Sequence, residues 1–388
     1  MKIGWAEVSI TPDKKVRLAG QFYERLSQYV ETPISVTALA VESGDEQMVI
    51  CSCDLVGIYE NLLAAVRKEL GSFEGLDAEK VMIGATHTHT SMKYKMKRSV
   101  SGGASLDILK RLLPESCIYS PLVTEDDDVM GDEECLNYLT GKIACAVKEA
   151  WSSRQEGYLA NAFGRVAVGM CRRATYDDGS AKMWGDTNSA NFDALEGGND
   201  SGMELMFTYD KNKAVTGVVA NIACPSQVLE HRSFISSDYW GKAKGFLREK
   251  LGNDFKVLAL CSAAGDQCPR DLIRWISPET PIDDPNIVRT EILPRKADPS
   301  MFDVSGAVRV GKRVANEILS AFEEQSEIKS DVVFRHQCKK IDLPVRRVTP
   351  AEYEEALKVI QNFAKETDGA FTFKDNARLH VYAGTVAR

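Results

Sequence analysis

A strand-helix-strand rhythm in the first quarter of the chain limits what it can fold into. Met48–Leu55 is a nearly continuous apolar run, which is typical of a strand covered on both faces. Tyr59–Leu70 has apolar residues at helical spacing, and Gly71 follows where helices are commonly capped. Lys80–Thr86 then predicts a second strand. A right-handed crossover through one helix would make the two strands a parallel pair.

The same rhythm returns later in the chain. Gly217–Cys224 and Lys256–Ser262 predict strands, and Tyr239–Leu251 between them predicts a helix. Amphipathic helices are expected at Val304–Phe322 and Pro350–Glu366. Repeated units of this kind favour an α/β fold, in which helices flank a mainly parallel or mixed sheet and the active cleft lies at the carboxyl ends of the strands.

Other regions interrupt this rhythm. Ser91–Glu134 contains adjacent glycines and charge runs, so it predicts a long irregular segment that forms a lid over the site. Ser277–Pro299 is rich in proline and predicts a surface connection. Leu379–Tyr382 alternates between apolar and polar residues, which is typical of a strand.

Charge and cysteine usage limit the partners and the location. A formal net charge of −8 argues against a nucleic-acid partner, because nothing would offset phosphate repulsion. No apolar stretch is long enough to form a transmembrane segment, and no secretory signal is visible. The ten cysteines include no Cys-x-x-Cys pair, so we expect reduced thiols and a cytoplasmic location. The oligomeric state is left open.

Two of the chain's five histidines stand in the run Ala85–Thr90, directly after a predicted strand. His87 and His89 are two residues apart, so on an extended chain both imidazoles point to the same side. Both can therefore face one spot at the carboxyl end of the strand. Asp54 ends the preceding strand and could ligate a metal, orient a histidine or cap the following helix. A lone His-x-His is by itself a weak metal signal.

Polar side chains also follow the later strands. Cys224 ends one strand, His231 lies in the loop after it, and Asp266 follows the next strand. All of them are therefore candidates for the same crevice. Zinc accepts mixed nitrogen, sulfur and oxygen ligands. The alternative for Cys224 is a buried small hydrophobic side chain.

The histidine run belongs to a longer series of short motifs: Gly4–Thr11, Leu18–Gly20, Ser52–Leu55, Ala85–His89, Ile235–Asp238 and Ala264–Asp266. In this order they resemble the N-terminal domain of the neutral/alkaline non-lysosomal ceramidase family. The resemblance extends from the first residues to about Arg270, and the Thr-His-Thr-His segment is its most specific part. It implies that residues 1–388 form a single ceramidase-like α/β domain whose C-terminal part is missing.

The resemblance implies a zinc amidase. In that family the first histidine of the run is a Zn²⁺ ligand, which corresponds to His87, and the second lies beside the substrate, which corresponds to His89. An arginine that contacts the reacting group corresponds best to Arg172, with Arg173 as the alternative. A pair of surface arginines on a strand is the other interpretation.

The chain departs from the family pattern in two ways. The family's second zinc histidine corresponds to Cys224, so either the Cys224 thiolate replaces it or His231 reaches in from the following loop. A glutamate and a tyrosine that complete the family's metal site have no counterpart before Arg388. We therefore expect a metal site that is open or empty, in a chain that is incomplete for catalysis.

Together these expectations describe a metal-dependent hydrolase. Zinc would activate a water for attack on an amide carbonyl, and Arg172 would stabilise the oxyanion. His89 would position substrate or move a proton, and Asp54 and Asp266 complete the candidate catalytic groups. The expected partner is a small-molecule or lipid amide substrate, either ceramide or a soluble N-acylated or sugar-like compound. A non-catalytic ligand-binding relative that lost the metal is the alternative.

Overall fold

The structure is a computed structural model that describes residues 1–21, 23–95, 100–117, 128–273, 303–344, 346–366 and 373–388. Within these residues an eight-stranded sheet runs in the order β14-β13-β12-β7-β1-β3-β4-β5. It contains parallel and antiparallel pairs and is flanked by helices, which confirms the predicted α/β class. Its strands are β1 (Lys2–Ser9), β3 (Ser35–Ser43), β4 (Glu46–Cys53), β5 (Val81–Ala85), β7 (Gln155–Arg165), β12 (Gly202–Asp210), β13 (Val215–Ile222) and β14 (Lys256–Cys261).

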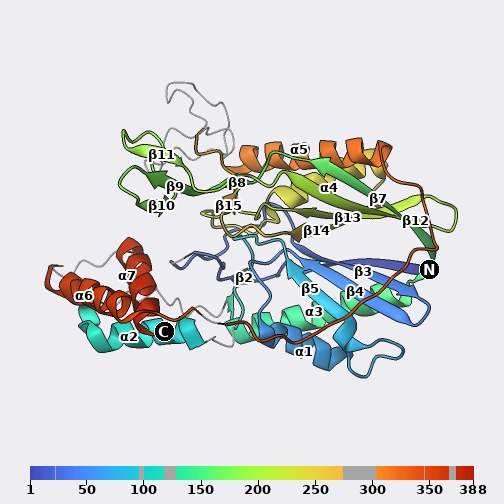
Figure 1. Cartoon of the computed structure of the whole chain (residues 1–388). Helices are drawn as coiled ribbons and strands as arrows, with labels where there is room; N and C mark the ends of the chain where they lie inside the picture. The colour runs from blue at the N-terminus through green and yellow to red at the C-terminus, as the bar shows by residue number, and fades with distance from the viewer. Residues whose placement is uncertain (22, 96–99, 118–127, 274–302, 345, 367–372) are drawn as a thin grey trace.

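The sheet folds back on itself, so that its two halves face each other (Figure 1). Apolar side chains of β1 and β3 pack against those of β13 and β14 between the halves. The Ser52 hydroxyl on β4 donates to the Ala259 carbonyl on β14 at 2.5 Å. Helices α4 (Asp238–Leu251) and α5 (Asp303–Glu323) cover one outer face, and α1 (Glu60–Leu70) and α3 (Asp132–Ser152) cover the other.

Parallel strand pairs create the edge at which the candidate residues lie. β4 pairs with β5, and β13 pairs with β14, in parallel, as the strand-helix-strand rhythm predicts. Near the ends of β5 and β14, a Cβ at Gly84 would lie 3.8 Å from the side chain of Leu260. The carboxyl ends of all four strands therefore meet in one region, which is where ligands bind in sheets of this kind.

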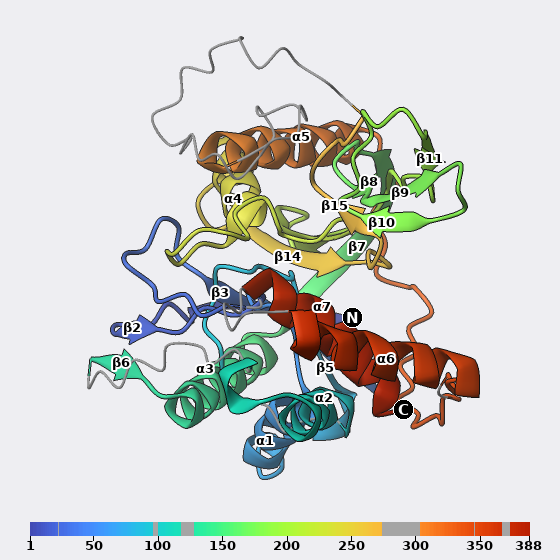
Figure 2. The same ribbon diagram turned by 90° about the vertical axis from the view of Figure 1, so that its left-hand side faces the viewer.

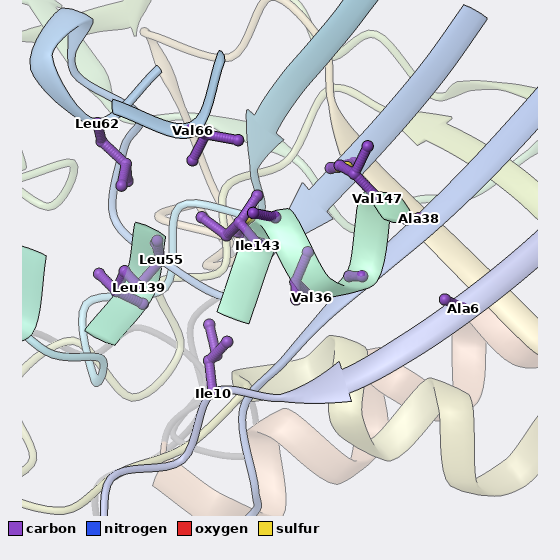
Figure 3. Packing of buried hydrophobic residues seen from close by; sticks show 14 of the residues in the cluster. Ala6, Ile10, Val36, Ala38, Leu55, Leu62, Val66, Leu139, Ile143 and Val147 are labelled. Atoms are coloured by element: carbon purple, nitrogen blue, oxygen red, sulfur yellow. The ribbon is translucent and has the colours of Figure 1, made fainter. Parts of the chain in front are cut away.

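Apolar spacing along α1 and α3 explains how they cover the sheet. Leu62 and Val66 are four residues apart on α1, and Leu139, Ile143 and Val147 repeat the same interval on α3. All of these side chains point into one buried cluster against the strands (Figure 3). Burying a side chain of this size contributes about 1.5–3 kcal/mol, so the cluster holds the two helices firmly on the sheet.

Helices α2 (Val100–Leu112), α6 (Pro350–Glu366) and α7 (Phe373–Val386) form a group beside the main body (Figure 2). Apolar side chains from the three helices pack on one another in a cluster of their own. Two predictions are wrong here. Ser91–Glu134 is not irregular throughout, because α2 lies within it, and Leu379–Tyr382 belongs to a helix because its buried residues continue at Ala383 and Val386 with helical spacing.

The remaining elements are short and fill the connections. Ser277–Pro299 falls outside the described residues, so its prediction stays open. Among the described helices none is both long and apolar enough to cross a bilayer. The short elements are β2 (Lys15–Val16), η1 (Ala78–Lys80), η2 (Glu115–Cys117), β6 (Val129–Met130), β8 (Met170–Cys171), β9 (Arg173–Tyr176), β10 (Ala181–Met183), β11 (Phe192–Leu195) and β15 (Gln267–Cys268).

Candidate active site

The loop that carries the histidines follows β5 and is anchored by its threonines. The hydroxyl groups of Thr88 and Thr90 donate to the carbonyl oxygen of Ser236 at 3.0 and 2.9 Å. The alternation of threonine and histidine therefore fixes one side of the loop and leaves the imidazoles on the other. His87 has a φ of +65°, a strained value for a residue with a side chain. Such strain concentrates at functional sites.

The ring of His87 has its orientation set by a backbone carbonyl. Its Nδ1 lies 2.6 Å from the oxygen of Val56. A carbonyl oxygen only accepts, so Nδ1 carries the proton of the neutral ring and Nε2 presents a lone pair. Burial, more than the nearby cation of Arg172, lowers the pKa of His87. The neutral form, in which Nε2 can bind a cation, is therefore favoured.

His89 faces His87 across a short gap. Their Nε2 atoms are 3.3 Å apart, and their ring planes meet at 69°. Burial, with smaller contributions from His87, Arg25 and Arg172, lowers the pKa of His89 to about 3. Gly20 lies against the His89 ring, where a Cβ would be 2.4 Å from its Cγ. The Leu18–Gly20 motif therefore supplies a surface that only glycine can provide.

Two side chains that the sequence analysis did not select contact His89. The Gln227 amide nitrogen lies 2.8 Å from Nε2 of His89, and a carboxylate oxygen of Glu230 lies 3.9 Å from Nδ1. Gln227 is 3% exposed, so its amide is enclosed in the site. Arg270 lies 3.7 Å from the other carboxylate oxygen of Glu230. The loop after β13 therefore contributes to the site through residues other than the predicted Cys224 and His231.

Arg172 points toward this group, whereas Arg173 does not. Arg172 donates to the carbonyl of Gly265 at 2.7 Å and lies 3.5 Å from Oε1 of Gln227. Its Nε is buried and has no hydrogen-bond partner among the described residues. Arg173, on β9 of the three-stranded sheet β10-β9-β11, instead pairs with the exposed Glu196. The structure thus places Arg172 beside the histidines through Gln227.

Arg25 holds the backbone beneath the site. It is 4% exposed and donates to the carbonyl oxygens of Ala19, His89 and Arg232 at 2.5–2.7 Å. One guanidinium group thus ties together the Leu18–Gly20 motif, the histidine loop and the loop after β13. No short-range pattern marks Arg25 in the sequence, because its three acceptors come from distant segments.

Asp54 supports the site from below. Its carboxylate accepts from the Ser35 amide at 2.9 Å and the Thr86 hydroxyl at 3.4 Å, and it lies 3.7 Å from the Lys244 ammonium. Burial raises the pKa of Asp54, and the Lys244 cation opposes this. The helix after β4 is preceded by Tyr59 as N-cap, so Asp54 does not cap it. Its contact with Thr86 fixes the start of the histidine loop.

Among the described residues, no hydrogen bond or ion pair joins the other predicted residues to the facing imidazoles. The Cys224 thiol is fully buried in the core under α4 and α5, and it donates to the Val168 carbonyl at 3.4 Å. His231 is exposed, and so is Asp266, whose backbone carbonyl accepts from the Arg172 amide at 2.8 Å. Within the described part of the chain, no group of three or more His, Cys, Asp or Glu side chains is placed to hold a metal ion.

A cavity of about 270 Å³ is lined by residues that contact the histidines, although neither His87 nor His89 is among its lining residues. It shares Gly20 with the His89 ring and Val56 with the His87 hydrogen bond. Its wall combines aromatic, apolar and charged side chains, with an ion pair between Arg17 and Glu24 at 2.7 Å. The lining residues are Arg17, Leu18, Ala19, Gly20, Gln21, Tyr23, Glu24, Val56, Tyr59, Met92, Lys93 and Tyr94.

Comparison with known proteins finds likeness at the level of the fold. No protein-family model and no curated protein sequence matches the chain. A neutral ceramidase from Pseudomonas aeruginosa superimposes with a TM-score of 0.58 at 16% identity, covering 83% of this chain and 45% of the ceramidase. A ceramidase complexed with C2 gives the same TM-score and identity over 83% and 44% of the two chains. This chain thus spans less than half the length of these neighbours, and the similarity shows a shared ceramidase-like fold.

Proposed function

We propose that this chain is a metal-dependent hydrolase of an amide bond. The observation that carries the proposal is the pair of Nε2 atoms of His87 and His89, which face each other at 3.3 Å. Since Nδ1 of His87 donates to Val56, the Nε2 atom of that ring presents a lone pair to its neighbour. The Gln227 amide nitrogen lies 2.8 Å from Nε2 of His89, so this nitrogen accepts from Gln227 until a cation takes its lone pair. The ceramidase-like fold supports hydrolysis as the reaction class.

The histidine pair fits a zinc ion in its spacing and protonation. Nitrogen ligands of tetrahedral zinc, at bonds of about 2.0–2.1 Å, lie about 3.3 Å from each other. A ligand histidine also commonly donates its second ring nitrogen to a carbonyl, as His87 does to Val56. We propose His87 as the primary ligand. Cys224 does not fit, because its thiol is buried against Val168 and burial raises its pKa well above the usual range.

Bound zinc would supply Lewis acidity and a water of lowered pKa. The Arg172 guanidinium would bind the oxygen of the scissile carbonyl as negative charge develops on it, using its buried and unpartnered Nε–H. His89 would hold the substrate or accept a proton beside His87. Gln227 would hold His89 and Arg172 in fixed positions relative to each other, since its side-chain amide contacts both.

The adjoining cavity favours a compact substrate over ceramide. At about 270 Å³ it lies below the about 300–1,000 Å³ of pockets that enclose drug-sized ligands. Charged residues such as Arg17 and Glu24 form part of its wall, which disfavours a long alkyl chain. We therefore propose a soluble N-acylated compound with a small acyl or sugar-like group as the substrate class.

Zinc content and activity, measured together, test the proposal. The purified chain, made without a histidine tag, would be analysed for zinc and assayed against N-acyl amides before and after chelation. Although the sequence predicts an open or empty metal site, the proposal requires zinc that chelation removes, with activity lost in parallel, and loss of both in His87→Ala. A chain that binds no added zinc would refute the metal assignment. Zinc binding without amide hydrolysis would instead favour the non-catalytic ligand-binding relative.

A further inference from the structure

Nδ1 of His89 is an unsatisfied polar atom of the site. This nitrogen is buried and has no hydrogen-bond partner among the described residues. Since the Gln227 amide nitrogen donates to Nε2 of the same ring, Nδ1 carries the proton of the neutral imidazole. A buried N–H without an acceptor costs about 1–3 kcal/mol. The chain would therefore gain stability from any acceptor that moved within reach.

The nearest acidic group is Glu230, with Oε2 at 3.9 Å from this nitrogen. That distance is longer than a hydrogen bond. The Glu230 side chain is 17% exposed. Its backbone carbonyl oxygen accepts a hydrogen bond from the side-chain amide of Gln21 at 3.0 Å, which holds the main chain in place. The adjacent Leu229 amide donates to the buried carboxylate of Asp238 at 2.8 Å.

Neighbouring groups aim the Glu230 carboxylate at the ring. Arg270 lies 3.7 Å from Oε1, and the Gln227 amide nitrogen lies 3.5 Å from Oε2. The Arg270 guanidinium is itself stacked over Trp184, with 5.3 Å between its carbon and the ring centroid. The cation faces one carboxylate oxygen, so the other is left toward Nδ1 of His89.

We infer that Glu230 is a positioning residue for His89, accepting its Nδ1–H so that Nε2, which faces His87 and accepts from Gln227, keeps its lone pair. His87 has the equivalent arrangement, with the Val56 carbonyl as acceptor. Both rings would then present Nε2 to the same point. The inference rests on the proposed function for its purpose, but the tautomer of His89 is a property of the chain itself. Loss of such an outer partner typically lowers metal affinity 10–100-fold.

Two separate measurements test the inference, one of the His89 tautomer and one of the zinc affinity. Two-bond ¹H–¹⁵N spectra of the full chain, with ¹⁵N-labelled histidine and His89→Ala for assignment, report which ring nitrogen carries the proton. We expect the Nδ1–H form in the unmodified chain and a shift toward Nε2–H in Glu230→Ala. Zinc titration should show an affinity about 10–100-fold weaker in Glu230→Ala. Glu249→Ala, an exposed change on α4, is the matched control.

The outcomes are distinct from failure of the proposed function. The NMR measurement of the His89 tautomer tests the inference whether or not the chain hydrolyses an amide. An unchanged tautomer in Glu230→Ala would overturn the inference. So would complete loss of zinc equal to that in His87→Ala, since Glu230 would then be a ligand itself. If Glu230→Ala does not fold, Glu230→Gln keeps the side-chain volume while weakening the acceptor, and the same two readings apply.

Discussion

Gly20 and the ring of His89 touch so closely that a Cβ at Gly20 would lie 2.4 Å from Cγ and from Nδ1 of the imidazole. Gly20 also has a φ of +94°, which residues with a side chain rarely adopt. The short contact and the positive φ both require glycine at position 20. Any side chain there would also displace the His89 ring. The Leu18–Gly20 motif is thus linked physically to the Thr-His-Thr-His run.

Gly20→Ala is therefore expected to disturb the site more than the fold. The alanine methyl must displace His89 and separate its Nε2 from that of His87, so zinc affinity should fall at least about tenfold. Backbone strain alone costs about 1–2 kcal/mol of unfolding free energy. Gly44→Ala is the matched control, because Gly44 has a φ of +59° and nothing within 4 Å. Equal zinc affinities in the two variants would contradict the role of Gly20.

Arg172→Ala is expected to lower kcat/KM about 10²–10³-fold, the usual cost of losing an oxyanion-stabilising donor. The unfolding free energy should change little, because the guanidinium accounts for few of the contacts that hold the fold. Arg173→Ala provides the comparison, since its pair with Glu196 lies on the surface, where ion pairs contribute little to stability. Enzyme kinetics and thermal unfolding on both variants check this. Similar kinetic losses in the two would reject the assignment of Arg172.

Cys224→Ala is expected to retain zinc. Its thiol lies in the core and bonds the Val168 carbonyl, so the variant should lose about 1 kcal/mol of stability and no metal affinity. His231→Ala should also retain zinc, because the side chain is exposed. Metal analysis of both variants beside His87→Ala provides the measurement. Zinc loss in either would restore that residue as a ligand.

Local patterns predict the parts of this protein that depend on short stretches of chain. The β4-β5 and β13-β14 pairs follow from apolar runs separated by helices, and both are confirmed. The strand pairing is set within short stretches of chain, so it can be predicted from local patterns. His87 and His89 do face each other, but not on an extended chain as their spacing predicts, because His87 has a φ of +65° and the distant Ser236 carbonyl anchors the loop.

The rest of the site depends on distant contacts. Gln227 and Glu230 reach His89 only because Asp238 holds the loop that carries them, through the amide of Leu229. Cys224 shows the opposite case, since it ends a predicted strand yet turns its thiol into the core under α4. Whether a residue at a strand end faces the crevice or the core depends on strand register, which the sequence alone does not fix.

Asp238 should give the chain a measurable pH dependence. Burial raises the pKa of Asp238 to about 6 from an ordinary 3.8, although backbone amides of Leu229 and Tyr239 oppose the shift. The folded chain therefore holds this proton more tightly, and unfolding free energy falls as pH rises from about 4 to about 6, by at most about 3 kcal/mol. Asp238→Asn should lack this slope, whatever its overall stability. Denaturant unfolding at several pH values tests this prediction, with the exposed Asp254→Asn as control. Equal pH dependence of the unfolding free energy in the unmodified chain and both variants would refute it.

The cavity beside the histidines predicts a limit on acyl length. Its volume of about 270 Å³ holds a short acyl group, and Tyr59 and Tyr94 form part of its wall with ring centroids 5.7 Å apart. We therefore expect kcat/KM of the zinc-loaded chain to be no higher for palmitoyl than for acetyl amides of one amine, since methylenes that stay outside the cavity do not gain the about 0.8 kcal/mol each that burial provides.

Tyr59→Ala separates cavity shape from general hydrophobicity. Removing this ring opens the wall while its backbone amide keeps its bond to the Tyr94 hydroxyl at 3.0 Å. The variant should accept longer acyl groups relative to acetyl, because the added space lies next to Val56 and Gly20. Tyr353→Ala on α6 is the control, since Tyr59 and Tyr353 are 39% and 40% exposed and only Tyr59 lines the cavity. A rate that rises steadily to palmitoyl in the unmodified chain would show that long-chain lipid amides fit, and the compact substrate class would be wrong.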